Sequence, residues 1–427
     1  MKFNYVYQNM KVFLENSENN LNVNFNLKLG ELVHNFKKND DKFQRWIYYQ
    51  ESFSTKLLDW FLKYENINKK NSLFLDPFCG SGSSLVGAQK NSIDAIGIDL
   101  NPLSCLISEV KTNTYKLSEI EACKNFKIPK FKKIDNVYSY YNLSIVKKIF
   151  SKKNLIKINL IKIIIKKIKN ENVKKILLLN LICILEKCSN YKKGGNGIKR
   201  RKKIENLDVF VEFKKSLKIV LADIESKKSK SKCTIYNEDI KRFEDINLGN
   251  KVSFSLFSPP YVNCFDYFEV YKIELWFGDF INNYDQLRLL RKKAITSNLN
   301  ADVKQKTDQI ISSKLLIKTM AYLNKQKHWN KNIPNMVNLY FIEMHNFLNS
   351  LKKKIKKDSK IGIVVGNSSY QGVPVATDLI LGEIAQSLGF KVKEIIVTRN
   401  NETSSQQYKK IGNLIKYIRE SIIILEL

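Results

Sequence analysis

The sequence is poor in the side chains from which disulfide frameworks and metal centres are built. Its 427 residues include seven cysteines at unrelated spacings, with no Cys-x-x-Cys pair. This arrangement argues against a disulfide framework and a zinc site, and it fits a reducing compartment. The three histidines, His34, His328 and His345, lie far apart in the sequence. We therefore expect no metal centre and no histidine acting as a general base.

Long uncharged apolar segments are also missing. No run of about 18 such residues occurs, and the first residues do not combine a basic start with an apolar stretch. We expect a cytoplasmic protein that is not associated with a membrane. Residues 153–169, where Lys recurs among Ile and Leu, also fit a helix lying on a membrane surface. Packing of such a helix on its own protein is the commoner case.

Proline is scarce and unevenly placed. Four of the seven prolines, Pro77, Pro102, Pro259 and Pro260, fall in three short segments that follow apolar, strand-like runs. Proline has no N–H group and fixes its own backbone angle, so it marks rigid loops. These three segments are therefore candidates for a binding site.

Acidic residues are too few to balance the basic ones. Lys and Arg number 73 against 41 Asp and Glu, which gives a net charge of +32 and a sequence pI near 9.6. Such a charge favours nucleic acid as a partner, because each neutralised phosphate releases counterions. Lys outnumbers Arg roughly eightfold, and this bias also fits a protein from an A+T-rich genome. Both interpretations stand at this point.

Alternating helix and strand patterns predict an α/β protein. Residues 55–67 and 83–91 have a helical pattern, and the apolar segments SLFLD and IDAIGID are typical of parallel strands in one β-α-β unit. Similar patterns return after residue 233. The last apolar run, at 421–427, is expected to pair antiparallel with a strand at 391–399. The prediction is a Rossmann-like sheet of about seven strands.

Two segments interrupt this alternation. Residues 116–232 combine Lys, Ile and Leu at helical spacing with a basic run at 191–203, and they predict a helical basic insertion. Residues 279–335 are polar and basic, and they predict a second insertion within the core. The predicted parts are an N-terminal extension at 1–34, a catalytic core at 35–115 and 233–427, and the two insertions.

The first candidate segment is Asp76-Pro77-Phe78-Cys79-Gly80-Ser81-Gly82. Glycines let the backbone approach a ligand and turn into a helix, and a carboxylate at a strand end accepts from a ligand amine or hydroxyl. Taken alone, the segment also fits an ordinary strand-to-helix turn.

The second candidate segment is Asp99 with Asn101-Pro102, at the end of the next strand. A carboxylate there is placed to accept from both ribose hydroxyls of a nucleoside. The fingerprint Gly-x-Gly-x-x-Gly is incomplete, because Leu85 stands three positions after Gly82. This pattern favours a ligand that has an adenosine group but no pyrophosphate.

The third candidate segment is Ser258-Pro259-Pro260-Tyr261, after the apolar run SFSLF. Two consecutive prolines hold the backbone rigid and leave neighbouring carbonyls to accept hydrogen bonds, so the loop is suited to hold an amino group. The Tyr261 ring offers a flat face for an extruded base. In isolation the segment also fits a rigid turn, but beside the other two it predicts a catalytic loop.

Together these segments resemble the amino-methylating DNA methyltransferases, which modify N4 of cytosine or N6 of adenine. DPFCGSGSSLVGAQ looks like the family's cofactor loop, GIDLNPL like its ribose-binding strand end, and SPPYVNCFDY like its catalytic loop. The similarity covers residues 43–110 and 233–270, and it is weaker over 360–410.

Two further sites follow from the resemblance. The stretch from Trp46 to Phe53-Ser54 is similar to the segment that closes on the methionine end of the cofactor, and Asp239 looks like the position that meets the adenine amino group. The resemblance implies S-adenosyl-L-methionine as cofactor. The implied cofactor-binding residues are Phe53, Ser54, Asp76, Phe78, Gly80, Gly82, Asp99, Asn101, Pro102 and Asp239.

The implied activity is methyl transfer to the exocyclic amino group of a flipped base in double-stranded DNA. Cytosine N4 leads because Ser258 begins the catalytic loop, where adenine enzymes more often have Asp or Asn. Adenine N6 and an RNA base are the alternatives. Cytosine-C5 chemistry is set aside, since the sequence has no Pro-Cys dipeptide.

The resemblance also implies a place in a restriction-modification system, with a cognate restriction endonuclease as possible partner. Residues 279–335 are a candidate for DNA recognition, although the position of the two insertions does not settle which one reads DNA. The oligomeric state stays open.

Overall fold

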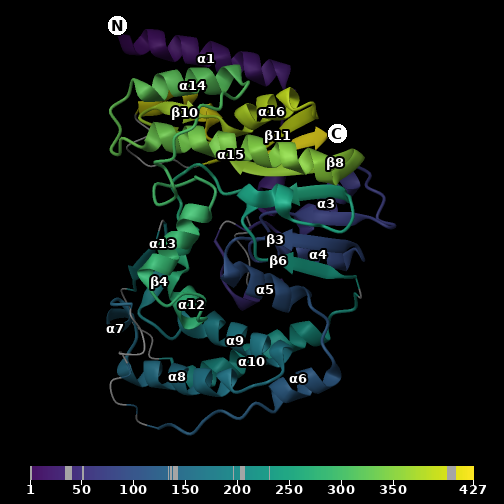
Figure 1. Cartoon of the computed structure of the whole chain (residues 1–427), viewed down its shortest axis with the longest axis vertical. Coiled ribbons are helices and arrows are strands. Elements are labelled where there is room, and N and C mark those ends of the chain that lie inside the picture. Colours follow the sequence, from purple (N-terminus) through teal and green to yellow (C-terminus); the bar gives the residue numbers. More distant parts are fainter. Residues whose placement is uncertain are drawn as a thin grey trace.

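The computed structural model describes residues 2–33, 41–50, 52–132, 134, 137, 143–195, 197–201, 207–229, 231–401 and 410–427, with side chains from residue 9 onward. His34, residues 202–203 of the basic run and residues 402–409 of the weaker similarity lie outside this range. Figure 1 shows an upper lobe built on a β-sheet and a lower lobe of helices, with α12 and α13 between them at the left.

Within the described residues, the upper lobe contains an eight-stranded sheet with the order β1-β11-β12-β8-β7-β2-β3-β6. Its strands are β1 (Val23–Phe25), β2 (Leu73–Asp76), β3 (Asp94–Ile98), β6 (Cys233–Tyr236), β7 (Val252–Phe257), β8 (Ile355–Gly366), β11 (Lys391–Asn400) and β12 (Arg419–Glu426). β12 runs antiparallel to β8 and β11, and the other pairs are parallel. The antiparallel pairing expected for the last strand is confirmed.

The strand order reverses between β2 and β7. From β2 the sheet continues through β3 and β6 on one side and through β7 and β8 on the other. This is the Rossmann-like arrangement that the sequence predicted. In such sheets ligands bind outside the carboxyl ends of the strands where the order reverses, so the ends of β2, β3 and β7 are where a site is expected.

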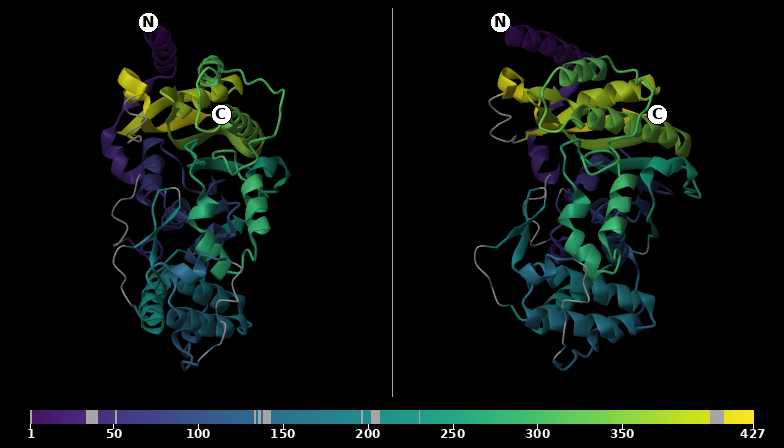
Figure 2. Two further views of the ribbon diagram at one scale, coloured as in Figure 1. Left: turned by 90° about the vertical axis from the view of Figure 1, so that its left-hand side faces the viewer. Right: turned by 60° about the vertical axis from the view of Figure 1, so that its left-hand side comes forward.

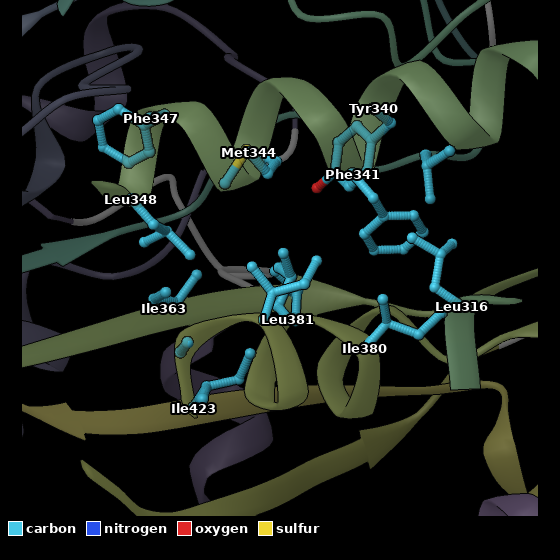
Figure 3. Close-up of a cluster of buried hydrophobic side chains, with 14 of the residues drawn as sticks. Leu316, Tyr340, Phe341, Met344, Phe347, Leu348, Ile363, Ile380, Leu381 and Ile423 are labelled. Carbon is cyan, nitrogen blue, oxygen red and sulfur yellow. The ribbon is translucent and has the colours of Figure 1, made fainter. Parts of the chain in front are cut away.

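Both faces of the sheet are buried, as parallel strands require. Phe74 points to the face covered by α3 (Lys56–Tyr64) and α4 (Ser83–Lys90), and the next residue, Leu75, points to the other face. That second face is covered by α15 (Ile333–Lys354) and α16 (Thr377–Ser387). Figure 3 shows Leu348 of α15 and Leu381 of α16 packed near Ile363 of β8. This alternation decides on which face of the sheet each strand side chain lies.

The lower lobe consists mainly of α6 (Leu117–Lys124), α8 (Lys152–Lys166), α9 (Glu171–Leu185) and α10 (Val209–Glu225). Its apolar core is continuous with side chains of α5 (Pro102–Thr112) and α12 (Lys272–Phe277). α8 includes most of the amphipathic segment at 153–169, and its Ile158 and Ile161 are fully buried in this core. The lobe is thus packed on α5, which begins at the candidate residue Pro102, and on α12, which follows the Ser258 segment after α11.

The remaining elements are shorter or lie at the edges. The helices are α1 (Lys2–Asn20), α2 (Gly30–Val33), α7 (Val146–Ile149), α11 (Tyr267–Val270), α13 (Tyr284–Lys293) and α14 (Lys314–Asn324), and the strands are β4 (Tyr191–Lys193), β5 (Ile198–Arg200), β9 (Ser368–Tyr370) and β10 (Val373–Val375). Among the described helices, none combines the length and apolar character needed to span a bilayer.

The N-terminal segment differs from the expectation. β1 adds to the sheet beside β11, and Met10 and Leu14 of α1 belong to the same apolar core as α16. The described part of the predicted extension, residues 2–33, is therefore not separate from the sheet, which has one strand more than predicted. A three-residue edge strand is too short to show the alternation by which strands are recognised.

Residues 279–335 do not form a single unit. α13 lies between the lobes, whereas α14 packs on the upper lobe through Leu315, Leu316 and Leu323. Figure 2 shows the two helices well apart along the long axis of the molecule. Only the part around α13 lies near the carboxyl edge of β2 and β3, and a recognition role for this insertion stays a prediction.

Candidate active site at the carboxyl edge of the sheet

A pocket opens at the carboxyl ends of β2, β3 and β7. It gathers seven of the predicted site residues: Phe78, Gly80, Asp99, Asn101, Asp239, Ser258 and Pro260. Tyr267, at the end of the segment that resembles the catalytic loop, also lines it. Residues that the sequence did not single out complete it, chiefly Tyr49, Phe268, Lys293, Ala294, Ile295, Ser297 and Asn298. The three candidate segments, separated by up to about 180 positions in the sequence, therefore meet in one place.

The loop from β2 to α4 depends on two glycines with positive φ. Gly80 has φ +48° and Gly82 has φ +75°, a region that strains other residues. A Cβ on Gly82 would lie 2.8 Å from Ser108 Oγ and 3.1 Å from Ser108 Cα, which is closer than packing allows. Gly82 thus lets α4 begin against α5, and it acts behind the pocket rather than in it.

Asp99 connects this loop to the end of β3. One of its carboxylate oxygens accepts from the N–H of Gly80 at 2.9 Å, and the other accepts from the N–H of Asn101 at 2.7 Å. Burial raises the pKa of Asp99 to about 6, although the two hydrogen bonds act in the opposite direction. The group is therefore ionised at neutral pH. A carboxylate has roughly four lone-pair sites, so Asp99 can still accept from a ligand hydroxyl.

Asn101 offers a donor to the same pocket. Its Oδ1 accepts from the N–H of Leu103 at 3.0 Å and caps α5, which leaves the side-chain amide group on the other side. Asn101 is 4 % exposed, and its Nδ2 has no hydrogen-bond partner within the described part of the chain. An unpaired buried donor costs about 1–3 kcal/mol. A ligand with an acceptor group would remove that cost.

The pocket therefore fits an adenosine-bearing ligand without pyrophosphate. Asp99 is placed to accept from hydroxyl groups, and Asp239, which follows β6, is placed to accept from an amino group. Asp239 Oδ1 already accepts from the N–H of Lys241 at 2.9 Å, and its second oxygen accepts no hydrogen bond from the described residues. Phe78 and Ile240 supply apolar walls for a ring.

Asp76 lies beneath this pocket and does not line it. It is 1 % exposed, and its oxygens accept from the N–H of Phe78 at 3.0 Å and from the hydroxyl of Ser84. Burial raises the pKa of Asp76 to about 7. These contacts hold the loop between β2 and α4 in shape, and a direct contact between Asp76 and a ligand stays a prediction.

Ser258 and Pro260 form the opposite wall. Ser258 directly follows β7, and its hydroxyl donates to Tyr261 Oη at 3.3 Å. Pro259 is buried and does not line the pocket. Because this loop and Asp99 line the same pocket, a group held by the Ser258 loop would lie beside a ligand held by Asp99.

Tyr261 lies beside the pocket rather than in it. Its ring packs over Gly366 of β8, where a Cβ would come within 2.7 Å of the ring. Its hydroxyl donates to Glu420 Oε1 at 2.6 Å, and the other oxygen of Glu420 pairs with Arg399. The stacking of a base on Tyr261 stays a prediction. Since one side of the ring packs on Gly366, the base would have to stack on the other side.

The segment after α13 was not foreseen as part of the site. Ile295 and Ser297 line the pocket, and the segment is fixed at both sides: Thr296 donates through its N–H and hydroxyl to Glu343 of α15, at 2.6 and 2.9 Å. The Ser297 carbonyl accepts from the N–H of Cys264 at 3.1 Å. Nothing in the local pattern ITSN marks it as functional, because its partners lie more than thirty positions away in the sequence.

Tyr49 is another pocket residue that the sequence did not single out, although it lies in the stretch that resembles the cofactor-closing segment. It is 5 % exposed, its hydroxyl is 2.7 Å from Ser104 Oγ, and its ring stacks on Tyr271 with centroids 4.7 Å apart. Burial raises the pKa of Tyr49 well above its ordinary value, so it stays protonated. Its ring forms a fixed apolar wall next to Gly80.

Phe53 and Ser54, predicted in the same stretch, do not line the pocket. Phe53 is 7 % exposed within the apolar core around α3, and Ser54 accepts at its side chain from the N–H of Lys56 at 3.3 Å. Pro102 is the first residue of α5 and also lies outside the pocket lining. Contacts of these residues with a cofactor stay predictions. Within the described residues, no group of three or more His, Cys, Asp or Glu side chains is arranged to hold a metal ion.

Comparison with known proteins finds relatives whose alignments cover most of the chain. The chain is 27 % identical over 418 residues to the Type II methyltransferase M.AvaI of Nostoc, covering 89 % of this chain and 86 % of that protein. It is 28 % identical over 458 residues to the Type II methyltransferase M.BsoBI of Geobacillus stearothermophilus, covering 94 % and 88 %. A shorter match, 38 % identical over 74 residues, is to the Type II methyltransferase M.MjaII of Methanocaldococcus jannaschii, with 17 % and 13 % covered.

Comparisons with family models and with solved structures do not narrow the assignment further. No family model matches the chain. The rRNA methyltransferase aviRa from Streptomyces viridochromogenes aligns over 93 % of this chain and 90 % of its own, with 9 % identity and a TM-score of 0.30. At that score the alignment carries no weight, and the fold assignment rests on the strand order itself.

Proposed function

We propose that the chain, which is 27 % and 28 % identical to two Type II methyltransferases over most of its length, is an amino-methylating DNA methyltransferase. In this proposal it transfers a methyl group from S-adenosylmethionine to N4 of a cytosine within a specific site in double-stranded DNA. The methyl donor follows from the family. The observation that carries the proposed transfer is that Ser258 and Pro260 line the same pocket as Asp99 and Asn101, and the choice of cytosine N4 rests on the serine that begins the loop. An acceptor amino group and the methyl donor would thus share one enclosed space.

The cofactor half of the pocket would hold the donor by polar contacts at both ends of its nucleoside. Asp99 accepts from the ribose hydroxyls, Asp239 accepts from the adenine amino group, and the Asn101 amide donates to a ligand acceptor. Bound there, S-adenosylmethionine supplies an electrophilic methyl group on a sulfonium. Tyr49 and Phe78 exclude water from that region, which strengthens the polar contacts.

The Ser258 loop would hold the target amino group. Ser258 Oγ and a carbonyl of the loop accept its two N–H bonds, which turns the nitrogen lone pair toward the methyl carbon. The new N–C bond forms as the C–S bond breaks, and one amino proton then leaves to water. Positioning provides most of the rate enhancement, because no covalent nucleophile is required.

The base must leave the duplex to reach this loop, at a cost of a few kcal/mol. We propose that it stacks on Tyr261 and that Tyr267, which lines the pocket, contacts its other side. The similarity to Type II methyltransferases supports a place in a restriction-modification system. A cognate restriction endonuclease recognising the same DNA site is the partner we propose.

The test is to incubate purified protein with S-adenosylmethionine labelled in its methyl group and with either duplex DNA or RNA, then digest each to nucleosides. The proposal expects label in N4-methylcytosine from duplex DNA. Label only in N6-methyladenine would overturn the cytosine assignment, and label only from RNA would overturn the DNA assignment. A Ser258→Ala variant in parallel shows whether the product depends on this pocket.

A further inference from the structure

The basic hairpin formed by β4 and β5 lies outside the pocket and has no role so far. Between Glu186 and Glu205 the sequence contains eight Lys and Arg residues and no acidic residue. β4 and β5 pair antiparallel within this stretch, with Tyr191 opposite Arg200, Lys192 opposite Lys199 and Lys193 opposite Ile198. We propose that the outer face of this hairpin binds the phosphate backbone of DNA beside the target base.

The two faces of the hairpin differ sharply. Tyr191 and Lys193 point inward, with 1 % and 8 % of their surface exposed, whereas Lys192 between them is exposed. Lys192 and its cross-strand neighbour Lys199 bring two positive charges together on the outer face. Like charges directly opposite each other destabilise a strand pair. A phosphate placed between the two ammonium groups would convert this repulsion into attraction.

The inner face anchors the hairpin firmly to the catalytic core. Lys193 pairs with Glu274 of α12 and, at 2.9 Å, with Glu186, while the hydroxyl of Tyr191 donates to Glu274 at 3.1 Å. Burial by itself lowers the pKa of Lys193, but the two carboxylates outweigh it and the net direction is upward. The buried ammonium group therefore stays charged, and the hairpin cannot separate from α12 without exposing an unpaired ion.

This anchor lies close to the pocket. Tyr271, which directly precedes α12, is stacked on the pocket residue Tyr49, and the ammonium group of Lys193 lies 5.4 Å from the Tyr271 ring centroid. β4 also lies at the left in Figure 1, opposite the labelled C-terminus at which the antiparallel strand β12 ends. The parallel strands therefore end on the side of the hairpin, and Figure 2 shows that side facing the viewer.

The turn of the hairpin favours close approach to a ligand. Gly194, Gly195 and Gly197 replace side chains there, and a Cβ added to Gly197 would meet no atom within 4 Å among the described residues. The absence of a side chain at these three glycines lets their main chain and the flanking lysines come near a sugar-phosphate backbone. Phosphate contacts of this kind position a protein on DNA without reading its sequence.

This inference rests on the proposed function, since it takes double-stranded DNA as the substrate. The test compares the double variant Lys192→Ala/Lys199→Ala with the control Lys70→Ala/Lys251→Ala. The control lysines are also exposed, but they precede β2 and β7, at the amino ends of the strands. DNA affinity of each protein is measured by fluorescence anisotropy on one duplex over a series of salt concentrations. The rate of methyl transfer is measured at saturating DNA.

We expect the hairpin variant to bind DNA roughly tenfold more weakly at moderate salt and to lower the slope of log K against log salt by about 1.8, because two phosphate contacts are lost. Its transfer rate at saturating DNA should match that of the wild type, and Lys192→Arg/Lys199→Arg should restore the slope. A hairpin variant with the slope of the control would overturn the inference while leaving the proposed function intact. A wild-type protein that neither binds nor methylates DNA would overturn both.

Discussion

The two walls of the pocket are built differently. On the cofactor side, both oxygens of Asp99 accept from main-chain N–H groups of Gly80 and Asn101, so the carboxylate is fixed by the backbone. On the acceptor side, the Ser258 hydroxyl donates to Tyr261 Oη at 3.3 Å, its one side-chain hydrogen bond among the described residues, and the Tyr261 hydroxyl donates to Glu420. The donor site is thus formed in advance, whereas the base site depends on side chains that can rearrange when a base enters.

Because the two walls are built differently, substitutions on them should affect different steps. The largest effect is expected at Ser258. Ser258→Ala removes an acceptor that the amino group needs in the transition state, so kcat should fall by about 10²–10³-fold. Isothermal titration calorimetry should show cofactor affinity within twofold of the wild type. A loss of cofactor binding equal to the loss of kcat would contradict the division between the walls.

Asp99→Ala tests the other wall. It removes a ligand contact and also the acceptor of two main-chain N–H groups, each worth about 1.5–3 kcal/mol when the acceptor is charged, so cofactor Kd should rise by about 10²-fold. The control is Asp94→Ala, an exposed carboxylate at the opposite end of the same strand. Unchanged cofactor affinity in Asp99→Ala, measured by calorimetry, would show that our account of the second strand is wrong.

The role of Tyr261 can be resolved by two substitutions. If a base stacks on its ring, Tyr261→Ala should reduce transfer by about 10 to 100-fold, from the 1–3 kcal/mol that base stacking contributes. Tyr261→Phe keeps the ring and removes the hydroxyl that bonds to Ser258 and Glu420, so its effect should be a few-fold. Single-turnover kinetics on the same duplex would distinguish them. Equal rates for the two variants would exclude stacking.

A smaller effect than those of the three alanine variants is expected for the pH dependence of cofactor binding. Asp99 accepts ligand hydroxyls best as a carboxylate, and burial raises its pKa to about 6. As pH falls from 7 to 5, protonation should therefore raise cofactor Kd by about tenfold. Asp99→Asn should bind more weakly at pH 7 but show no such change between pH 7 and 5. A wild-type Kd that stays constant over this range would remove Asp99 from ligand binding.

Sequence patterns predicted the parts of this site that are local. Asp99, Gly80 and Ser258 each follow a short apolar strand, so their position at the carboxyl edge follows from the order of elements. The pocket contribution of Ile295 and Ser297 was missed, because it depends on a contact between Thr296 and Glu343 that no local pattern encodes. Tyr49 was missed for the same reason, since its orientation depends on Tyr271, more than 200 positions later.

For the fold too, the local elements were predicted and the features that depend on distant contacts were missed. The burial of Phe74 and Leu75 on opposite faces of β2 follows from an apolar parallel strand. β1 was missed because its three residues pair at an edge through backbone bonds rather than through an apolar pattern. The place of Tyr261 over Gly366 is also a tertiary result, made possible by a strand residue without a side chain.

The most direct test of the central claim is the methylation state of DNA in a bacterial host that produces this protein and has no amino methylation of its own. Genomic DNA from that host would be digested to nucleosides and measured by mass spectrometry, beside a culture producing the Ser258→Ala variant at equal level. We predict N4-methylcytosine with the wild type and a level near background with the variant. N6-methyladenine alone, or no modified base with the wild type, would contradict the account.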